Sequence, residues 1–77
     1  MKKIKSIEQL KKESKNGADF FILLNYGLRS SKNVCFDGKE FEVYNEIDDT
    51  SQVLTEKQLF TKSNIGKAIE QGAFFKD

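Results

Sequence analysis

The sequence has no histidine, no proline and no tryptophan, and it has a single cysteine. Without histidine there is no imidazole base, no histidine-dependent catalytic triad and no histidine-ligated metal site. One cysteine excludes an intramolecular disulfide and also excludes zinc and iron–sulfur sites built from several thiolates. We therefore expect no metal and no cofactor. The lone Cys35 points to a reducing compartment, for which the cytoplasm is the simplest choice.

Long apolar segments are also missing. The longest apolar run is FFILL at residues 20–24, whereas a helix that spans a bilayer needs about 20 apolar residues. Three of the first five residues are lysines, but no apolar stretch typical of a signal peptide follows them. We expect no membrane contact and a cytoplasmic location.

Groups suited to catalysis are scarce. The chain has no glycine-rich phosphate-binding motif and no calcium-binding loop. Its densest carboxylate cluster is Glu46, Asp48 and Asp49, and adjacent aspartates after a strand are typical of a turn. Cys35 has no histidine to activate it as a nucleophile. The sequence therefore favours a protein that is not an enzyme.

The charges that are present are segregated along the chain. The 77 residues suit one domain, 1–77, and the 38% apolar and 32% charged residues indicate a folded, globular chain. The net charge is only +1, but residues 1–15 hold six lysines and two glutamates, whereas residues 37–56 hold seven acids and one lysine. Any electrostatic attraction to a partner must therefore be local.

The first half of the chain has clear boundaries of secondary structure. SIEQ at residues 6–9 has the form of a capping box and predicts a helix near 6–15, which Asn16-Gly17 would end. The apolar run that follows predicts a strand within residues 18–26. Residues 27–31 are expected to form a turn or a wide loop.

Alternating segments at 33–36 and 41–47 predict a hairpin around an Asp-Gly pair. A two-residue loop would pair Val34 with Phe41, whereas a four-residue loop would pair Phe36 with Phe41. Both registers place the same apolar side chains on one face, because they differ by two residues. The pattern predicts the buried face and leaves the register open.

The last third of the chain predicts helices. TEKQ at residues 55–58 is a second capping box, which predicts a short helix near 56–61, and another helix is expected to begin at Ser63 or Asn64 and to end at Gly72. The predicted fold is α+β: a helix, a three-stranded antiparallel meander, then one or two C-terminal helices packed on one sheet face. We expect a monomer or a weak homodimer that pairs through an edge strand of the hairpin at residues 34–43.

The first candidate binding segment is the predicted loop at residues 27–32. It contains the only arginine, Arg29, with Ser30, Ser31 and Lys32. A loop of this composition can hold a phosphate or a carboxylate through its guanidinium and backbone donors. The alternative is a basic loop that only keeps one end of the sheet soluble.

The second candidate is the polar face of the predicted hairpin. Tyr44 points away from Val43 and is flanked by Glu42 and Glu46, among other acids. An exposed aromatic ring surrounded by carboxylates can dock on a basic protein surface; the alternative is an ordinary polar outer face. These features predict a non-catalytic protein-interaction or regulatory module with a protein partner.

RNA binding is the alternative function. A helix, three strands and a final helix would have the layout of the double-stranded-RNA-binding domain, although the lysine-rich motif of that family is absent. The residues that would contact RNA in such a layout are Lys11, Lys12, Lys15, Arg29, Lys32, Lys62 and Lys67.

Four segments carry a resemblance to other proteins: GLRSSK (27–32), FEVYNEIDD (41–49), LTEKQL (54–59) and NIGKAIEQGA (64–73). They resemble small uncharacterised proteins of low-GC Gram-positive bacteria and their mobile elements. The resemblance implies a bacterial or phage origin and no known activity.

Overall fold

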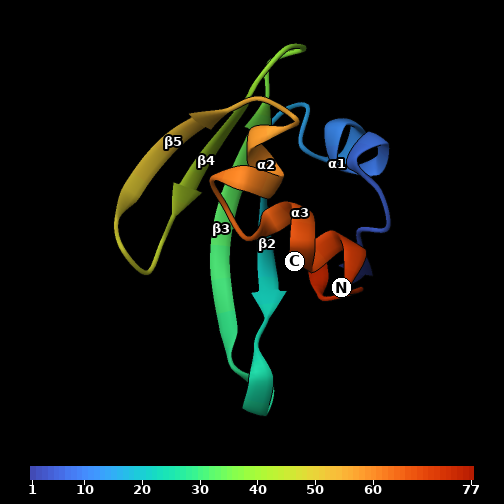
Figure 1. Ribbon diagram of the computed structural model, residues 1–77, viewed down its shortest axis with the longest axis vertical. Coiled ribbons are helices and arrows are strands. Elements are labelled where there is room, and N and C mark those ends of the chain that lie inside the picture. The colour runs from blue at the N-terminus through green and yellow to red at the C-terminus, as the bar shows by residue number, and fades with distance from the viewer.

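One antiparallel sheet of six strands, with all three α-helices on one of its faces, makes up the structure (Figure 1). It is a computed structural model that describes residues 1–77. The strands are β1 (Lys2–Lys3), β2 (Ala18–Leu23), β3 (Arg29–Phe36), β4 (Phe41–Asn45), β5 (Thr50–Leu54) and β6 (Phe74–Lys76). The helices are α1 (Ile7–Glu13), α2 (Gln58–Thr61) and α3 (Ile65–Glu70), with a 3-10 turn η1 (Asn25–Gly27). The strand order is β1-β6-β2-β3-β4-β5.

The predicted three-stranded meander with terminal helices is therefore wrong. The chain begins with strand β1, continues from the hairpin into a fourth meander strand, β5, and ends with strand β6 inserted between β1 and β2. The strands β1 and β6 have two and three residues, too few to show an alternating pattern. They form because β6 pairs with β1 on one side and with β2 on the other. Both pairings join segments that are far apart in the sequence.

The predicted loop at residues 27–31 is also wrong. Strand β3 begins at Arg29, and Ser30 pairs with Ile22 of β2. The reversal between the two strands comes earlier, where the N–H of Leu24 donates to the carbonyl of Leu28 at 2.8 Å. The polar residues Arg29, Ser30 and Ser31 suggested a loop. Each of them pairs with an apolar residue of β2, and the strong strand propensity of β2 holds this segment in the sheet.

The hairpin of β3 and β4 adopts the register with a four-residue loop, since Phe36 pairs with Phe41. The carboxylate of Asp37 accepts hydrogen bonds from the backbone N–H groups of Lys39 (2.8 Å) and Glu40 (2.7 Å). Both hydrogen bonds lower the pKa of the Asp37 carboxyl, and the one from the Glu40 N–H has the larger effect. The hairpin was predicted to supply an edge strand of the sheet. That prediction is wrong, because β2 and β5 flank the hairpin. The edges are β1 and β5.

Both predicted capping boxes form; α1 begins after Ser6, as predicted, whereas α2 begins at Gln58, two residues later than predicted. Ser6 Oγ accepts from the N–H of Gln9 at 3.1 Å, and the Gln9 side chain accepts from the N–H of Lys5 at 2.7 Å. Thr55 and Gln58 bond each other reciprocally, at 3.0 and 3.3 Å. Side-chain acceptors satisfy amides that have no partner within the first turn of a helix.

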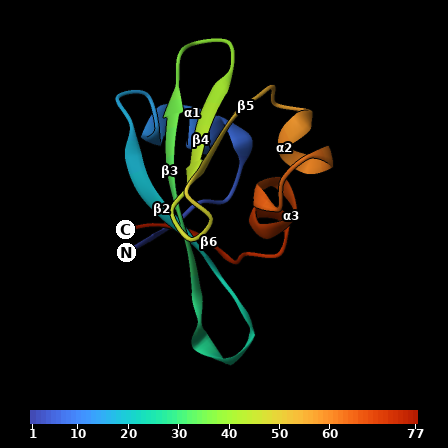
Figure 2. The ribbon, with the colours of Figure 1, turned by 90° about the vertical axis from the view of Figure 1, so that its left-hand side faces the viewer.

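The core lies between the sheet and the helices (Figure 2). Phe20 of β2 stacks on Phe74 of β6 with 5.4 Å between ring centres. The helices contribute Leu10, Leu59, Ile65, Ala68 and Ile69. Helices of seven residues or fewer are unstable in isolation, so this packing holds them. None of them is long and apolar enough to cross a membrane.

Candidate protein-binding surface

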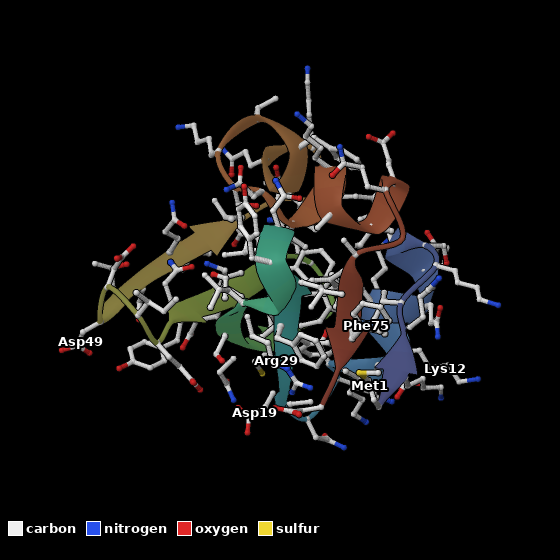
Figure 3. All side chains as sticks on the ribbon, turned by 90° about the horizontal axis from the view of Figure 1, so that it is seen from below. Met1, Lys12, Asp19, Arg29, Asp49 and Phe75 are labelled. Carbon is white, nitrogen blue, oxygen red and sulfur yellow. The ribbon has the colours of Figure 1, made fainter.

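All three helices pack on one face of the sheet, so the other face carries no helix; we call it the open face. Figure 3 shows α2 and α3 above the sheet, with Arg29 and Asp19 projecting below it. Because side chains alternate along a strand, the residues on this face follow from the register. They are Lys3, Asp19, Phe21, Leu23, Arg29, Ser31, Asn33, Cys35, Glu42, Tyr44, Ser51, Val53 and Phe75.

The structure splits the first candidate segment between two faces. Arg29 and Ser31 lie on the open face, whereas Ser30 and Lys32 point to the helix side. The ammonium group of Lys32 donates to Asn45 Oδ1 at 2.6 Å. Partial burial lowers the pKa of Lys32, and the nearby charge of Asp48 opposes that effect. The four residues therefore do not form an anion-binding loop.

Arg29 packs against an aromatic ring instead. Its guanidinium lies 4.2 Å from the centre of the Phe21 ring, and one of its nitrogens lies 3.8 Å from the carboxylate of Asp77. Phe21 in turn stacks on Phe75, at 5.3 Å between ring centres, and is almost fully buried. The Lys3 ammonium lies 5.9 Å from the Phe75 ring. Cationic side chains thus cover the aromatic pair on this part of the open face.

The second candidate group is brought together beside the free strand β5. Tyr44 is 37% exposed and lies across from Ser51, and Glu42 lies across from Val53. The hydroxyl of Tyr44 donates to the Asp49 carboxylate at 2.6 Å, and this hydrogen bond raises the pKa of Tyr44.

Glu46 follows β4 directly and anchors the turn that leads into β5. Its backbone N–H donates to the carbonyl of Ser31 at 3.2 Å. The turn ends at Asp49, which has a φ of 54°, a conformation that aspartate tolerates better than most residues. The aromatic and acidic side chains predicted for this face therefore border one edge of the sheet.

The turn between β2 and β3 overlaps the candidate segment 27–32 only at Gly27 and Leu28, and its other exposed residues, Leu24 and Tyr26, were not predicted as part of a site. This hairpin end projects beyond the rest of the molecule (Figures 1 and 2) and exposes Leu24, Tyr26 and Leu28. Tyr26 is 99% exposed and adopts a φ of 70°, a conformation that costs a non-glycine residue about 1 kcal/mol. The signal in the sequence was three apolar residues around an Asn and a Gly, which usually mark an exposed turn.

The basic residues are distributed over several surfaces. Lys11, Lys12 and Lys15 line a groove of about 490 Å³ between α1 and the end of β3, together with Phe36 and the two acids Glu8 and Asp37. The Lys11 ammonium forms ion pairs with Glu56 (2.7 Å) and Glu8 (3.4 Å), which raise the pKa of Lys11, the Glu56 hydrogen bond most.

The remaining basic residues lie away from that groove. Arg29 is at the opposite end of β3, and Lys67 lines a second pocket of about 300 Å³ beside the turn of β2 and β3. The layout of a double-stranded-RNA-binding domain is therefore wrong for this chain, because neither its strand order nor its single basic surface is present. RNA binding itself stays a prediction.

No three histidine, cysteine, aspartate or glutamate side chains lie together as a metal site would require. Cys35 is half-buried on the open side of the sheet, across from Glu42. No protein-family model, no curated protein and no solved structure matches the chain.

Proposed function

We propose that this protein is a non-catalytic protein-interaction module, which contacts its partner through the open face and the adjoining turn of β2 and β3. One observation carries the proposal: a helix-free sheet face continues into a projecting turn with exposed apolar side chains. In that turn Leu24 is 45% exposed, Tyr26 is 99% exposed and Leu28 is 63% exposed, all within five residues. Apolar side chains grouped in this way on the surface of a small domain mark an interaction site.

The composition of this surface also suits a protein interface. Such interfaces combine aromatic and aliphatic contacts at their centre with a polar rim. Here Tyr26 and Tyr44 supply aromatic groups, which are enriched among residues that dominate binding energy. Glu42, Glu46 and Arg29 supply charges around them.

Affinity capture from an extract of the source organism tests the proposal. The bait proteins are the unmodified chain, Tyr26→Ser with Leu28→Ser, Tyr44→Ala, and Lys12→Ala as a matched surface control. We expect the unmodified chain and the control to retain at least one protein that neither the turn variant, Tyr26→Ser with Leu28→Ser, nor the open-face variant, Tyr44→Ala, retains. Far-ultraviolet circular dichroism checks that each variant is folded. Identical capture by all four baits would contradict the proposal.

RNA binding through α1 is the second candidate function. The observation that favours it is the groove in which three lysines border the Phe36 ring, since basic side chains bind phosphates and an aromatic ring can stack on a base. Titration of a labelled RNA duplex at two salt concentrations tests this function. Binding that weakens with salt and is lost in Lys12→Ala with Lys15→Ala supports it, whereas no binding at low salt removes it.

A further inference from the structure

The two edges of the sheet differ in a way that bears on what the protein binds. The β1 edge has two residues, both lysines. The β5 edge has five, TSQVL, with no charge and no proline. Folded proteins protect exposed edges against pairing with other strands by making them short or by placing lysine or proline on them. The β1 edge has that protection, and the β5 edge does not.

Hydrogen bonds at the ends of the β3–β4 hairpin show which backbone groups of β5 are free. The N–H of Asp37 donates to the carbonyl of Glu40, and the N–H of Glu46 donates to the carbonyl of Ser31. Because hydrogen-bonded pairs alternate in an antiparallel ladder, the even-numbered residues of β4 bond to β3. The odd-numbered residues of β4 therefore bond to β5. Their partners there are Leu54, Gln52 and Thr50.

Ser51 and Val53 are the two remaining interior residues of β5, and their N–H and C=O groups point away from β4. No strand lies on that side, because β5 ends the sheet (Figure 1). Both residues are exposed, and their side chains lie on the open face beside Tyr44 and Glu42. The edge therefore presents two donors and two acceptors at the spacing of a β-ladder.

The surroundings of this edge are acidic. Residues 40–56, which include β4, the turn and β5, contain no lysine or arginine. Their acids are Glu40, Glu42, Glu46, Asp48, Asp49 and Glu56. Of these, only Glu56 is in an ion pair. A strand that arrives at this edge would enter a region of negative potential, which favours lysine and arginine.

We propose that the free edge of β5 binds an extended, basic segment of a partner protein, which adds to the sheet as a seventh strand. The backbone of the segment would pair with Ser51 and Val53. Those of its side chains that lie on the open face would be beside Val53. Glu42 is two strand spacings from such a residue, about 10 Å, within reach of an extended arginine or lysine. The inference rests on the proposed function and names the chemistry of the partner.

A second copy of the chain fits the edge less well. Two β5 strands that overlap over all five residues in an antiparallel pair would place Gln52 opposite Gln52. In that register the acidic turn before β5 in one copy would approach Glu56, which follows β5 in the other, and such a juxtaposition of like charges is unfavourable. A basic segment has no such repulsion.

An eight-residue peptide of alternating lysine and valine, blocked at both ends, is the probe. Bound to the ¹⁵N-labelled protein, it is expected to shift the amide signals of β5 and to slow hydrogen exchange at Ser51 and Val53 by about ten-fold. Salt should weaken the binding. A matched peptide with glutamate in place of lysine, and a lysine peptide N-methylated at every amide, should not bind.

Ser51→Pro and Ser51→Ala form the matched pair of variants. Proline removes only an N–H that points to solvent and is tolerated on an edge strand, so both variants should fold, with unfolding midpoints that agree. We expect Ser51→Pro to weaken peptide binding by about ten-fold or more and Ser51→Ala to leave it unchanged. Equal binding by both variants, shifts that leave out β5, or no shift at all would overturn the inference.

Sedimentation velocity separates self-association from peptide binding. A dimer that Ser51→Pro dissociates would assign the edge to a second copy and overturn the proposal of a basic segment. The proposed function has its own readout, because partner capture that depends on Tyr44 and on the turn at Tyr26 can persist when the peptide fails to bind.

Discussion

The guanidinium of Arg29 lies 4.2 Å from the centre of the Phe21 ring, so the only arginine of the chain covers an aromatic residue on the open face. A guanidinium is planar and weakly hydrated, so it stacks on aromatic rings more readily than an ammonium does. Phe21 is 1% exposed although no helix covers it. Arg29 therefore contributes to stability by shielding Phe21 from water.

Arg29→Ala should lower the free energy of unfolding by about 1 kcal/mol, since it removes the cation–π contact and the packing of the side-chain stem. Arg29→Lys should retain part of that stability. Urea denaturation measures both variants, and Lys39→Ala, in the exposed hairpin loop, is the control. A loss for Arg29→Ala no larger than that of the control would show that the stacking has no energetic role.

Gly66 lies against the ring of Phe60, and this contact fixes how α3 packs on α2. A Cβ added at Gly66 would come within 2.3 Å of Phe60 Cδ1 and 2.5 Å of Phe60 Cγ. Alanine in a helix is favoured over glycine by about 1 kcal/mol, but forcing the ring to move costs about 1–3 kcal/mol. Gly66→Ala should therefore destabilise the protein.

The same substitution should change sign when the ring is absent. In a Phe60→Ala background, Gly66→Ala meets no ring, and its helix propensity should then raise the free energy of unfolding. Chemical denaturation of the four proteins of this double-mutant cycle measures the coupling. Additive effects of the two substitutions would contradict the packing argument.

The sequence predicted the elements that local signals determine. A capping box is a signal of only four residues, such as the one from Thr55 to Gln58, and it marks the start of a helix. The alternating segments on either side of Asp37-Gly38 mark a hairpin in the same local way. The strands β1 and β6 have no comparable signal, because they form only when β6 pairs with β1 and β2 at the same time. The order of strands was therefore beyond a reading of local pattern.

The candidate site was predictable to the same extent. Tyr44 and Glu42 could be assigned to one face, because alternation fixes the direction of a side chain once its strand is known. Arg29 could not be placed, since its position over Phe21 depends on the pairing of β2 with β3. Tyr26 belongs to an apolar stretch that resembles a buried strand, so its exposure contradicts the usual expectation for such residues.

The carboxylate of Glu13 links α1 to both strands at one side of the sheet. It accepts from Lys2 of β1 at 2.6 Å and from Lys76 of β6 at 3.1 Å, and these hydrogen bonds lower the pKa of Glu13, the Lys2 bond most. A lowered pKa means that the folded state favours the charged form. The resulting stability is present above the ordinary pKa of about 4.5 and is lost as the pH falls through the folded-state pKa.

Glu13→Gln should therefore be less stable than the unmodified protein at about pH 7, and the difference should shrink as the pH falls to about 3. Urea midpoints of the two proteins across this range provide the measurement. A difference that stays constant with pH would mean that the glutamate acts through its shape and not through its charge.

The hydrogen bond from Tyr44 to Asp49 makes a titration prediction of the opposite sign. The bond raises the pKa of Tyr44 above its ordinary value of about 10, so the stability it contributes is present at neutral pH and is lost as the pH rises through the folded-state pKa. Asp49→Asn should lower the pKa of Tyr44 towards its ordinary value. Asparagine also tolerates the positive φ of this position, so the turn should be kept.

Ultraviolet absorbance of tyrosinate follows this titration, and Tyr26→Phe removes the only other tyrosine so that the signal belongs to Tyr44. An unchanged pKa in Asp49→Asn would show that Glu46 and burial, which also raise it, dominate over the hydrogen bond. A lowered pKa would establish that the Asp49 carboxylate interacts with the Tyr44 hydroxyl beside the β5 edge. Because Tyr44 lies across from Ser51, that contact would then help to set the surface that an incoming strand meets.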